Sequence, residues 1–293
     1  MGRATALLKI ALFVIFAACF SSVTSSLLMS TGEMMFKDAE SLVLMFTRIG
    51  QLFGLLAAFV VGFKQIGIFE QLGLHLSISR NQVPNLISGL FMALGIQTLL
   101  FLVYVASDYP VSLTSEGLLD WFLFGFVYSC VVHLCVSVTE ELLFRGYLLD
   151  RLTNVAGYPL AVIIQAAVFS LFHIFNPGYS VMAFAGLFLF GVLTAQLKHV
   201  SQGLWQPIVF HIFWNVSQGT IYGYVVSGNV EPMRLLQMNL EGQAWITGGN
   251  FGPEAGIYCI LILLLVVMLT QVRIQLAASL LRKLSSGGKS IHS

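Results

Sequence analysis

Two adjacent acids, Glu140 and Glu141, interrupt a long apolar stretch, and Arg145 follows the second acid by four residues. That spacing puts Glu141 and Arg145 on one helix face with the acid N-terminal to the base, so we expect Arg145 to neutralise Glu141. Glu140 points about 100° away and has no such partner. Because a carboxylate can accept a proton from water, Glu140 is the candidate general base. In the alternative interpretation, both acids lie solvated at a helix end.

His173 and His211 stand in two later apolar stretches, and Asn215 follows His211 by one helical turn. A lone histidine in such a stretch is usually a packing residue, but three polar sites on three helices can meet at one depth. If the chain turns back between residues 156 and 159, Glu140 and His173 each lie about 15 residues, roughly 22 to 25 Å, from that turn. His211 and Asn215 lie roughly 12 to 18 Å beyond the turn before their own helix. We expect all four side chains to line one cavity.

The same donors allow a metal site as an alternative. Glu140, His173 and His211 would suit zinc with one position open for water. The sequence has no H-E-x-x-H spacing, so it leaves metal dependence open. His133 lies seven residues before Glu140 on nearly the same helix face. We interpret His133 as a packing or cavity-lining residue.

The composition requires lipid as the solvent of the elements that carry these residues. Hydrophobic residues make up 57% of the 293 positions, charged residues only 9%, and the mean hydropathy is +0.88. Each crossing of a bilayer needs roughly 20 apolar residues, and eight windows approach that length. They run from Leu7 to Leu28, Ser41 to Phe63, Val83 to Ala106, Leu118 to Val138, Pro159 to Phe175, Tyr179 to Leu197, Leu204 to Tyr222 and Ala255 to Leu276. The sequence therefore predicts an all-α membrane protein with about eight transmembrane helices.

Basic residues predict the orientation, because cytoplasmic loops retain positive charge. With the N-terminus and C-terminus inside, two basic residues, Lys37 and Arg234, lie outside and Arg48 lies within a span, near enough to its boundary to snorkel. Eleven others lie inside: Arg3, Lys9, Lys64, Arg80, Arg145, Arg151, Lys198, Arg273, Arg282, Lys283 and Lys289. This count places the 156–159 turn inside and Glu140 well away from it, which leaves the side of substrate entry undecided.

No repeat or hydrophilic domain interrupts the spans, and the longest polar stretch, Gly223 to Glu254, is a loop of moderate length. We predict a single membrane domain over residues 1–293, with a catalytic core at 118–222 in the later spans. The first window also allows a signal-peptide interpretation, whose cleavage would remove one span. Cys19, Cys130, Cys135 and Cys259 lie in apolar windows without metal-like spacing and are expected to be buried free thiols.

Three motifs in this order resemble those of the CAAX prenyl protease and bacteriocin-processing (CPBP, or Abi) family of intramembrane proteases. E-E-x-x-x-R is present from Glu140 to Arg145, F-x-x-x-H from Phe169 to His173, and H-x-x-x-N from His211 to Asn215. The resemblance covers about a third of the chain, from Trp121 to Gln218. E-E-x-x-x-R alone would be weak, but three motifs on successive polar-marked spans are specific together.

The resemblance implies an intramembrane endopeptidase without a serine or cysteine nucleophile. Glu140 and His173 would activate a water for attack on a peptide carbonyl, and His211 with Asn215 would stabilise the oxyanion. Glu141 and Arg145 would hold the first motif in shape. The implied partners are the lipid bilayer and a membrane-associated peptide or protein substrate, in a bacterial cell membrane. The net charge of +1 suggests no nucleic acid partner.

Two other functions stay open at this point. A catalytically silent member of the same fold could regulate a membrane partner, because activity itself is not visible in a sequence. A transporter or proton relay would also place acids and histidines inside a membrane, although the sequence lacks an inverted repeat and glycine-rich broken helices.

Overall fold

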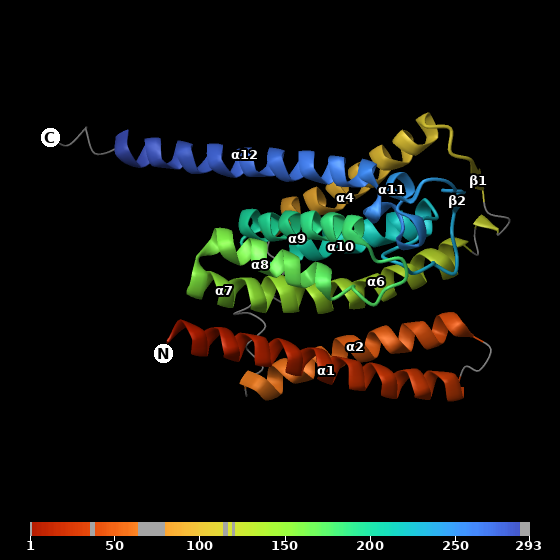
Figure 1. The fold of residues 1–293 in the computed structure, drawn as a ribbon, viewed down its shortest axis with the longest axis horizontal. Helices are drawn as coiled ribbons and strands as arrows, with labels where there is room; N and C mark the ends of the chain where they lie inside the picture. Colours follow the sequence, from red (N-terminus) through yellow and green to blue (C-terminus); the bar gives the residue numbers. More distant parts are fainter. Residues whose placement is uncertain (1, 36–38, 64–79, 114–116, 119–120, 288–293) are drawn as a thin grey trace.

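The computed structural model describes residues 2–35, 39–63, 80–113, 117–118 and 121–287. It is a bundle of helices that run roughly along one axis, so the predicted all-α membrane fold is confirmed (Figure 1). Six helices in the described part are long and apolar enough to cross a membrane. A small two-stranded sheet, which the sequence did not indicate, joins two connections at one end of the bundle.

The helices and strands follow one another in this order. They are α1 (Arg3–Met35), α2 (Glu40–Phe63), η1 (Arg80–Gln82), α4 (Val83–Ala106), β1 (Val111–Leu113), η2 (Trp121–Phe126), α6 (Val127–Glu140), η3 (Glu141–Leu148), α7 (Leu149–Ala156), α8 (Tyr158–Leu171), α9 (Val181–Ser201), α10 (Trp205–Val216), η4 (Ser217–Ile221), β2 (Leu236–Met238), α11 (Ala244–Thr247), η5 (Gly249–Phe251), η6 (Pro253–Ala255) and α12 (Ile257–Gly287). The strands β1 and β2 pair antiparallel, with Ser112 opposite Gln237.

Two of the eight sequence windows give helices shorter than a full crossing. The helix α8 has 14 residues and α10 has 12, with a further turn in η4. Neighbouring helices enclose α10, since most of its residues are buried in the protein. An enclosed helix can end inside the membrane because neighbouring protein, rather than lipid, surrounds its terminal backbone groups. The window that ends at Phe175 is corrected accordingly, because α8 stops at Leu171 and His173 lies in the following turn.

The fourth span is one long helix with an altered centre. It runs over Phe124–Ala156, but its middle section η3, which begins at Glu141, has π-helical rather than α-helical bonding. The section is entirely buried, and Lys198 of α9 donates from Nζ to the Arg145 carbonyl oxygen at 2.7 Å and to Asp150 Oδ1 at 2.6 Å. Because short π segments are rare and concentrate at functional sites, this interruption marks the E-E-x-x-x-R motif. It also moves Arg145, counted above with the inside loops, to a buried place within the span.

The helices α1 and α2 form a hairpin that packs against α6 (Figure 1). Gly50 brings their backbones together, because a Cβ atom there would lie 2.8 Å from the Thr24 carbonyl oxygen. Ser21 Oγ donates to the Gln51 carbonyl at 2.7 Å, and Thr24 Oγ1 donates to the Gly50 carbonyl at 2.9 Å. Small residues and interhelical hydroxyl bonds are the usual means of close packing in lipid.

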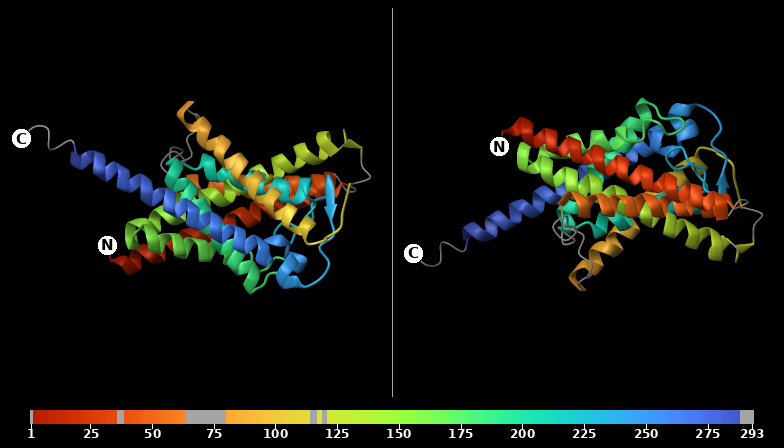
Figure 2. Two further views of the ribbon diagram at one scale, coloured as in Figure 1. Left: turned by 90° about the horizontal axis from the view of Figure 1, so that it is seen from above. Right: turned by 90° about the horizontal axis from the view of Figure 1, so that it is seen from below.

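The helix α1 begins and α12 ends at the same end of the bundle, and the C-terminal part of α12 extends past the other helices (Figure 2). The sheet and the connection between η4 and α12 lie at the opposite end. The four cysteines are free as expected, but Cys19 is exposed on α1 and Cys130 is only half-buried, which corrects the prediction that all are buried. Both lie on helix faces that the protein leaves partly uncovered.

Candidate active site

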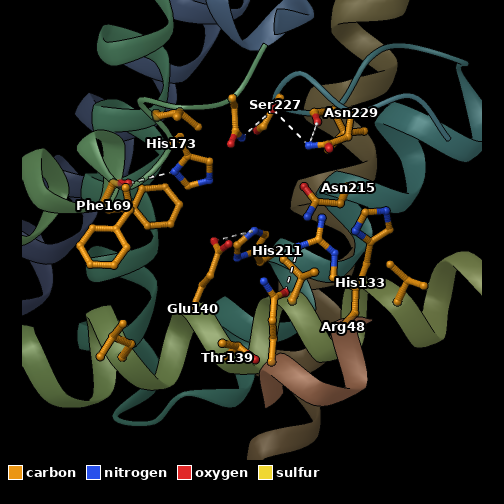
Figure 3. A pocket seen from close by; sticks show the side chains of 18 of the residues that line it. Arg48, His133, Thr139, Glu140, Phe169, His173, His211, Asn215, Ser227 and Asn229 are labelled. Carbon is orange, nitrogen blue, oxygen red and sulfur yellow. Dashed lines mark hydrogen bonds and ion pairs between the residues drawn. The ribbon is translucent and has the colours of Figure 1, made fainter. Parts of the chain in front are cut away.

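A cavity of about 370 Å³ lies inside the bundle, and all four candidate catalytic residues line it (Figure 3). Glu140 comes from the end of α6, His173 from the turn after α8, and His211 and Asn215 from α10. The structure thus brings together side chains that are up to 75 positions apart in the sequence (215 minus 140). The helices α1, α2 and α9 and the connection after η4 supply further parts of the wall.

Glu141 does not line this cavity but lies behind it as a link between two motifs. Its Oε1 accepts from Arg145 Nη1 at 3.0 Å, which is the ion pair expected from the four-residue spacing. The same oxygen accepts from His211 Nδ1 at 2.9 Å. Glu141 and Arg145 are both completely buried. Because an ionised carboxylate is only an acceptor, His211 must carry its proton on Nδ1, which leaves Nε2 facing the cavity.

Phe169 of the F-x-x-x-H motif supports the arrangement from the opposite side. The Arg145 guanidinium carbon lies 4.2 Å from the centroid of the Phe169 ring, within the range of a cation–π interaction. The Phe169 carbonyl oxygen accepts from His173 Nδ1 at 3.0 Å, one helical turn later. This bond fixes the ring of His173 with Nε2 directed into the cavity (Figure 3). One phenylalanine therefore contacts both the buried cation and the cavity histidine.

Glu140 and His211 face each other across a short gap. Glu140 Oε2 lies 3.8 Å from His211 Nε2, and the Glu140 side chain keeps 23% of its surface exposed while that of His211 keeps 5%. Since Nδ1 of His211 is already committed to Glu141, a proton can be shared or passed between Nε2 and Glu140. Asn215 lies one turn further along α10 and points into the same space (Figure 3). The arrangement offers a base, two imidazoles and an amide around one opening.

A tight turn after η4 covers the far side of the cavity. Val226 and Asn229 bridge as its ends, and Ser227 and Gly228 both have positive φ angles, 46° and 87°. Asn176 Nδ2 donates to the Ser227 carbonyl oxygen at 2.8 Å. Ser227 in turn donates through its backbone N–H to Glu254 Oε2 at 2.8 Å and through its hydroxyl at 2.6 Å. We refer to residues 226–229 as the covering turn.

Two acids of the polar connection belong to the cavity wall and were not found by sequence reasoning. Glu231 Oε1 lies 3.0 Å from His133 Nε2, and both side chains are nearly buried. Glu254 Oε1 accepts from Trp214 Nε1 at 3.1 Å. Acids are common in polar loops, so nothing in the sequence distinguishes these two from others. An acid within an apolar window is unusual and can be recognised from the sequence. The interpretation of His133 as a packing or cavity-lining residue fits its place in the wall.

The donors proposed for a metal do not form a compact set in this structure. Among the residues that the structure describes, no group of three or more histidine, cysteine, aspartate or glutamate side chains has the arrangement of a metal site. His173 Nδ1 and His211 Nδ1 are both bonded to other oxygens, which leaves their Nε2 atoms as the ring nitrogens that could bind a metal. We derive no step that passes through a metal, and metal dependence stays a question for chelation.

Comparison with known families identifies the central part of the chain. Residues 120–217 match the family described as type II CAAX prenyl endopeptidase Rce1-like. The matched residues include all three motifs and amount to about a third of the chain. No curated protein and no solved structure gave a match. The predicted resemblance to the CPBP family is confirmed over residues 120–217, which match the Rce1-like CAAX prenyl endopeptidase family.

Proposed function

We propose that this protein is an intramembrane endopeptidase that hydrolyses a peptide bond of a membrane-associated substrate. One observation carries the proposal: Glu140, His173, His211 and Asn215 line a single cavity within helices that cross the membrane. The match to a family of CAAX prenyl endopeptidases supports the reaction class. The cavity has a volume of about 370 Å³ and would have to open further to hold several residues of an extended peptide. We therefore expect only a short segment of the substrate to enter it.

In the proposed reaction, Glu140 and the Nε2 atom of His173 orient a water molecule. The water oxygen adds to the carbonyl carbon while one of its protons passes to Glu140. The carbonyl oxygen becomes an oxyanion, to which the Asn215 amide donates. His211 donates to it from Nε2 in its doubly protonated form, with the other ring proton on Nδ1 toward Glu141. When the C–N bond breaks, the proton held by Glu140 passes to the leaving nitrogen. The products are a carboxylic acid and an amine, which become a carboxylate and an ammonium group when the acid proton passes to the amine.

Glu141 and Arg145 are positioning residues in this proposal. Glu141 holds the ring of His211 through Nδ1, and Arg145 balances the charge of Glu141 where both side chains are completely buried. A buried acid without that cation would cost several kcal/mol, so the pair is needed to keep the imidazole in place. In this proposal Glu140 takes part in the proton transfer, whereas Glu141 only holds His211 in position.

The proposed topology places both ends of the chain on the cytoplasmic side of a bacterial cell membrane. The basic residues near the start of α1 and the end of α12 support it, together with the location of both at one end of the bundle. The covering turn then lies on the outer side, and substrate enters from there or laterally. Single cysteines introduced at residues 3 and 229 test this, because only the second should react with a membrane-impermeant maleimide in intact cells.

Cleavage by purified protein tests the activity. The unaltered chain, Glu140→Gln and the matched surface control Glu241→Gln are reconstituted in liposomes with fluorogenic membrane peptides, including one with a prenylated CAAX terminus. We expect Glu140→Gln to lose about 10²- to 10⁴-fold in kcat and Glu241→Gln to keep its rate. Full activity of Glu140→Gln would refute the proposed base.

The same preparations separate the other functions. Absence of cleavage by the unaltered chain against every peptide would favour a silent regulator of a membrane partner. Solute flux that stops in Glu140→Gln would favour a transporter. Loss of cleavage on treatment with a chelator, restored by zinc, would show that a metal takes part.

A further inference from the structure

Arg48 is a cation of the cavity wall that the proposed reaction does not use. It stands on α2, eight residues after Glu40, so its Cα atom lies about 12 Å along the helix from that end. The side chain does not snorkel out of the bundle but lines the cavity, on the side of His133 and away from His173 (Figure 3). A charged residue at membrane depth is costly unless it has a partner, which makes its function a reasonable question.

The protein itself satisfies only a small part of this guanidinium. Arg48 Nη1 donates to Gln51 Oε1 at 2.9 Å, and Nε is buried with no hydrogen-bond partner among the residues that the structure describes. An arginine has five N–H donors, so most remain available. In the described part of the chain, no acidic side chain lies within 4.0 Å of its nitrogens. Within these described residues, Arg48 is therefore a cation of the cavity wall that forms no ion pair.

The acids that share the cavity already have other partners. Glu231 pairs with His133, and Glu254 accepts from Trp214 and Ser227. Glu140 faces His211. None of these carboxylates forms an ion pair with Arg48 within 4.0 Å, so the guanidinium is available for a negative charge that a ligand supplies.

We propose that Arg48 binds a carboxylate of the substrate and so selects peptides that present one near the scissile bond. This inference rests on the proposed peptidase function. The planar guanidinium can hold a carboxylate through two parallel hydrogen bonds, which fixes orientation as well as charge. With the carboxylate on the side of His133, the rest of the peptide extends across the cavity past Glu140. The carboxylate is either the C-terminus of the peptide or an aspartate or glutamate side chain.

The location of Arg48 makes this selectivity a property of the N-terminal hairpin. The residue lies outside the segment 120–217 that matches the family. The catalytic residues come from that segment, whereas α1 and α2 supply one wall of the cavity. Substrate choice and chemistry are thereby assigned to different parts of the chain.

Binding of short peptides tests the proposal without turnover. The full chain carrying Glu140→Gln is titrated with three fluorescein-labelled apolar tetrapeptides, one with a free C-terminal carboxylate, one with a C-terminal amide, and one amide with an internal aspartate. Fluorescence polarisation gives Kd. We expect the better carboxylate peptide to bind about 10- to 100-fold more tightly than the plain amide. The preference should disappear with Arg48→Gln, decrease with Arg48→Lys, and persist with Arg273→Gln, a control at an exposed arginine of α12.

Which peptide gains affinity identifies the source of the carboxylate. Equal Kd values for all three peptides, absence of binding by any of them, or a preference that survives Arg48→Gln would overturn the proposal. The comparison of carboxylate and amide peptides on the chain that keeps Arg48 remains valid even if Arg48→Gln does not fold. If the carboxylate peptide binds preferentially but the unaltered chain cleaves no peptide, the proposed role of Arg48 is supported and the proposed peptidase function is refuted. If the chain cleaves carboxylate and amide peptides with equal kcat/KM, the peptidase function is supported and the proposed role of Arg48 is refuted.

Discussion

Glu141→Gln is expected to destabilise the protein far more than Glu140→Gln, although the residues are neighbours and the substitutions are identical. Glu141 is completely buried and accepts from both Arg145 and His211. Glu140 has a partly exposed side chain and no partner nearer than 3.8 Å among the ion pairs of the described residues. Replacing Glu141 leaves the Arg145 charge buried without compensation, whereas replacing Glu140 leaves no buried charge unpaired.

The magnitude follows from the burial of the pair. Removal of one partner of a buried ion pair costs about 3 to 5 kcal/mol, and glutamine keeps one acceptor oxygen, so we take about 3 kcal/mol for Glu141→Gln. For Glu140→Gln we expect about 0 to 1 kcal/mol, as for exposed pairs. At about 2 to 4 °C per kcal/mol, the Tm of Glu141→Gln should fall by about 6 to 12 °C. The Tm of Glu140→Gln should change by no more than a few degrees.

Thermal unfolding in one detergent, followed by tryptophan fluorescence, measures both variants beside the unaltered chain. A double variant, Glu141→Gln with Arg145→Met, supplies the control, because removing both charges should recover part of the lost stability. Cleavage should decrease in both single variants, but only Glu140→Gln should lose it while its Tm is kept. An equal fall in Tm for the two variants, or no fall for Glu141→Gln, would refute the assignment of a structural role to Glu141 and a catalytic role to Glu140.

Two further predictions concern packing and the covering turn. Gly50→Ala should destabilise the α1–α2 hairpin by about 1 to 3 kcal/mol, because the new Cβ would meet the Thr24 carbonyl oxygen at 2.8 Å. Gly95→Ala, with no atom within 4 Å of its Cβ, should instead stabilise by about 0.5 to 1 kcal/mol, and the two Tm shifts should have opposite signs. Glu231→Gln should weaken the bond to His133 and speed amide hydrogen exchange at residues 226–229, as read by mass spectrometry. Unchanged exchange there would mean that other contacts hold the turn.

The sequence alone determined the features that depend on neighbours along one helix. Composition and apolar length predicted an all-α membrane protein, because lipid leaves the backbone few alternatives. The four-residue spacing predicted the ion pair of Glu141 with Arg145, which the structure contains. Rise per residue predicted that Glu140, His173 and His211 lie at one depth, and the structure places them around one cavity.

Only the tertiary structure decided which groups meet across helices. The bond from His211 to Glu141 joins residues 70 positions apart, and the bond from His133 to Glu231 joins residues 98 apart. Spacing fixes which residues share a face, but the rotation of each helix about its axis follows from packing against all its neighbours. For that reason the sequence left Arg48 as a snorkelling side chain and assigned no role to the loop acids. The direction of Arg48 into the cavity depends on how closely Gly50 lets α2 approach α1, and on how the hairpin then meets α6.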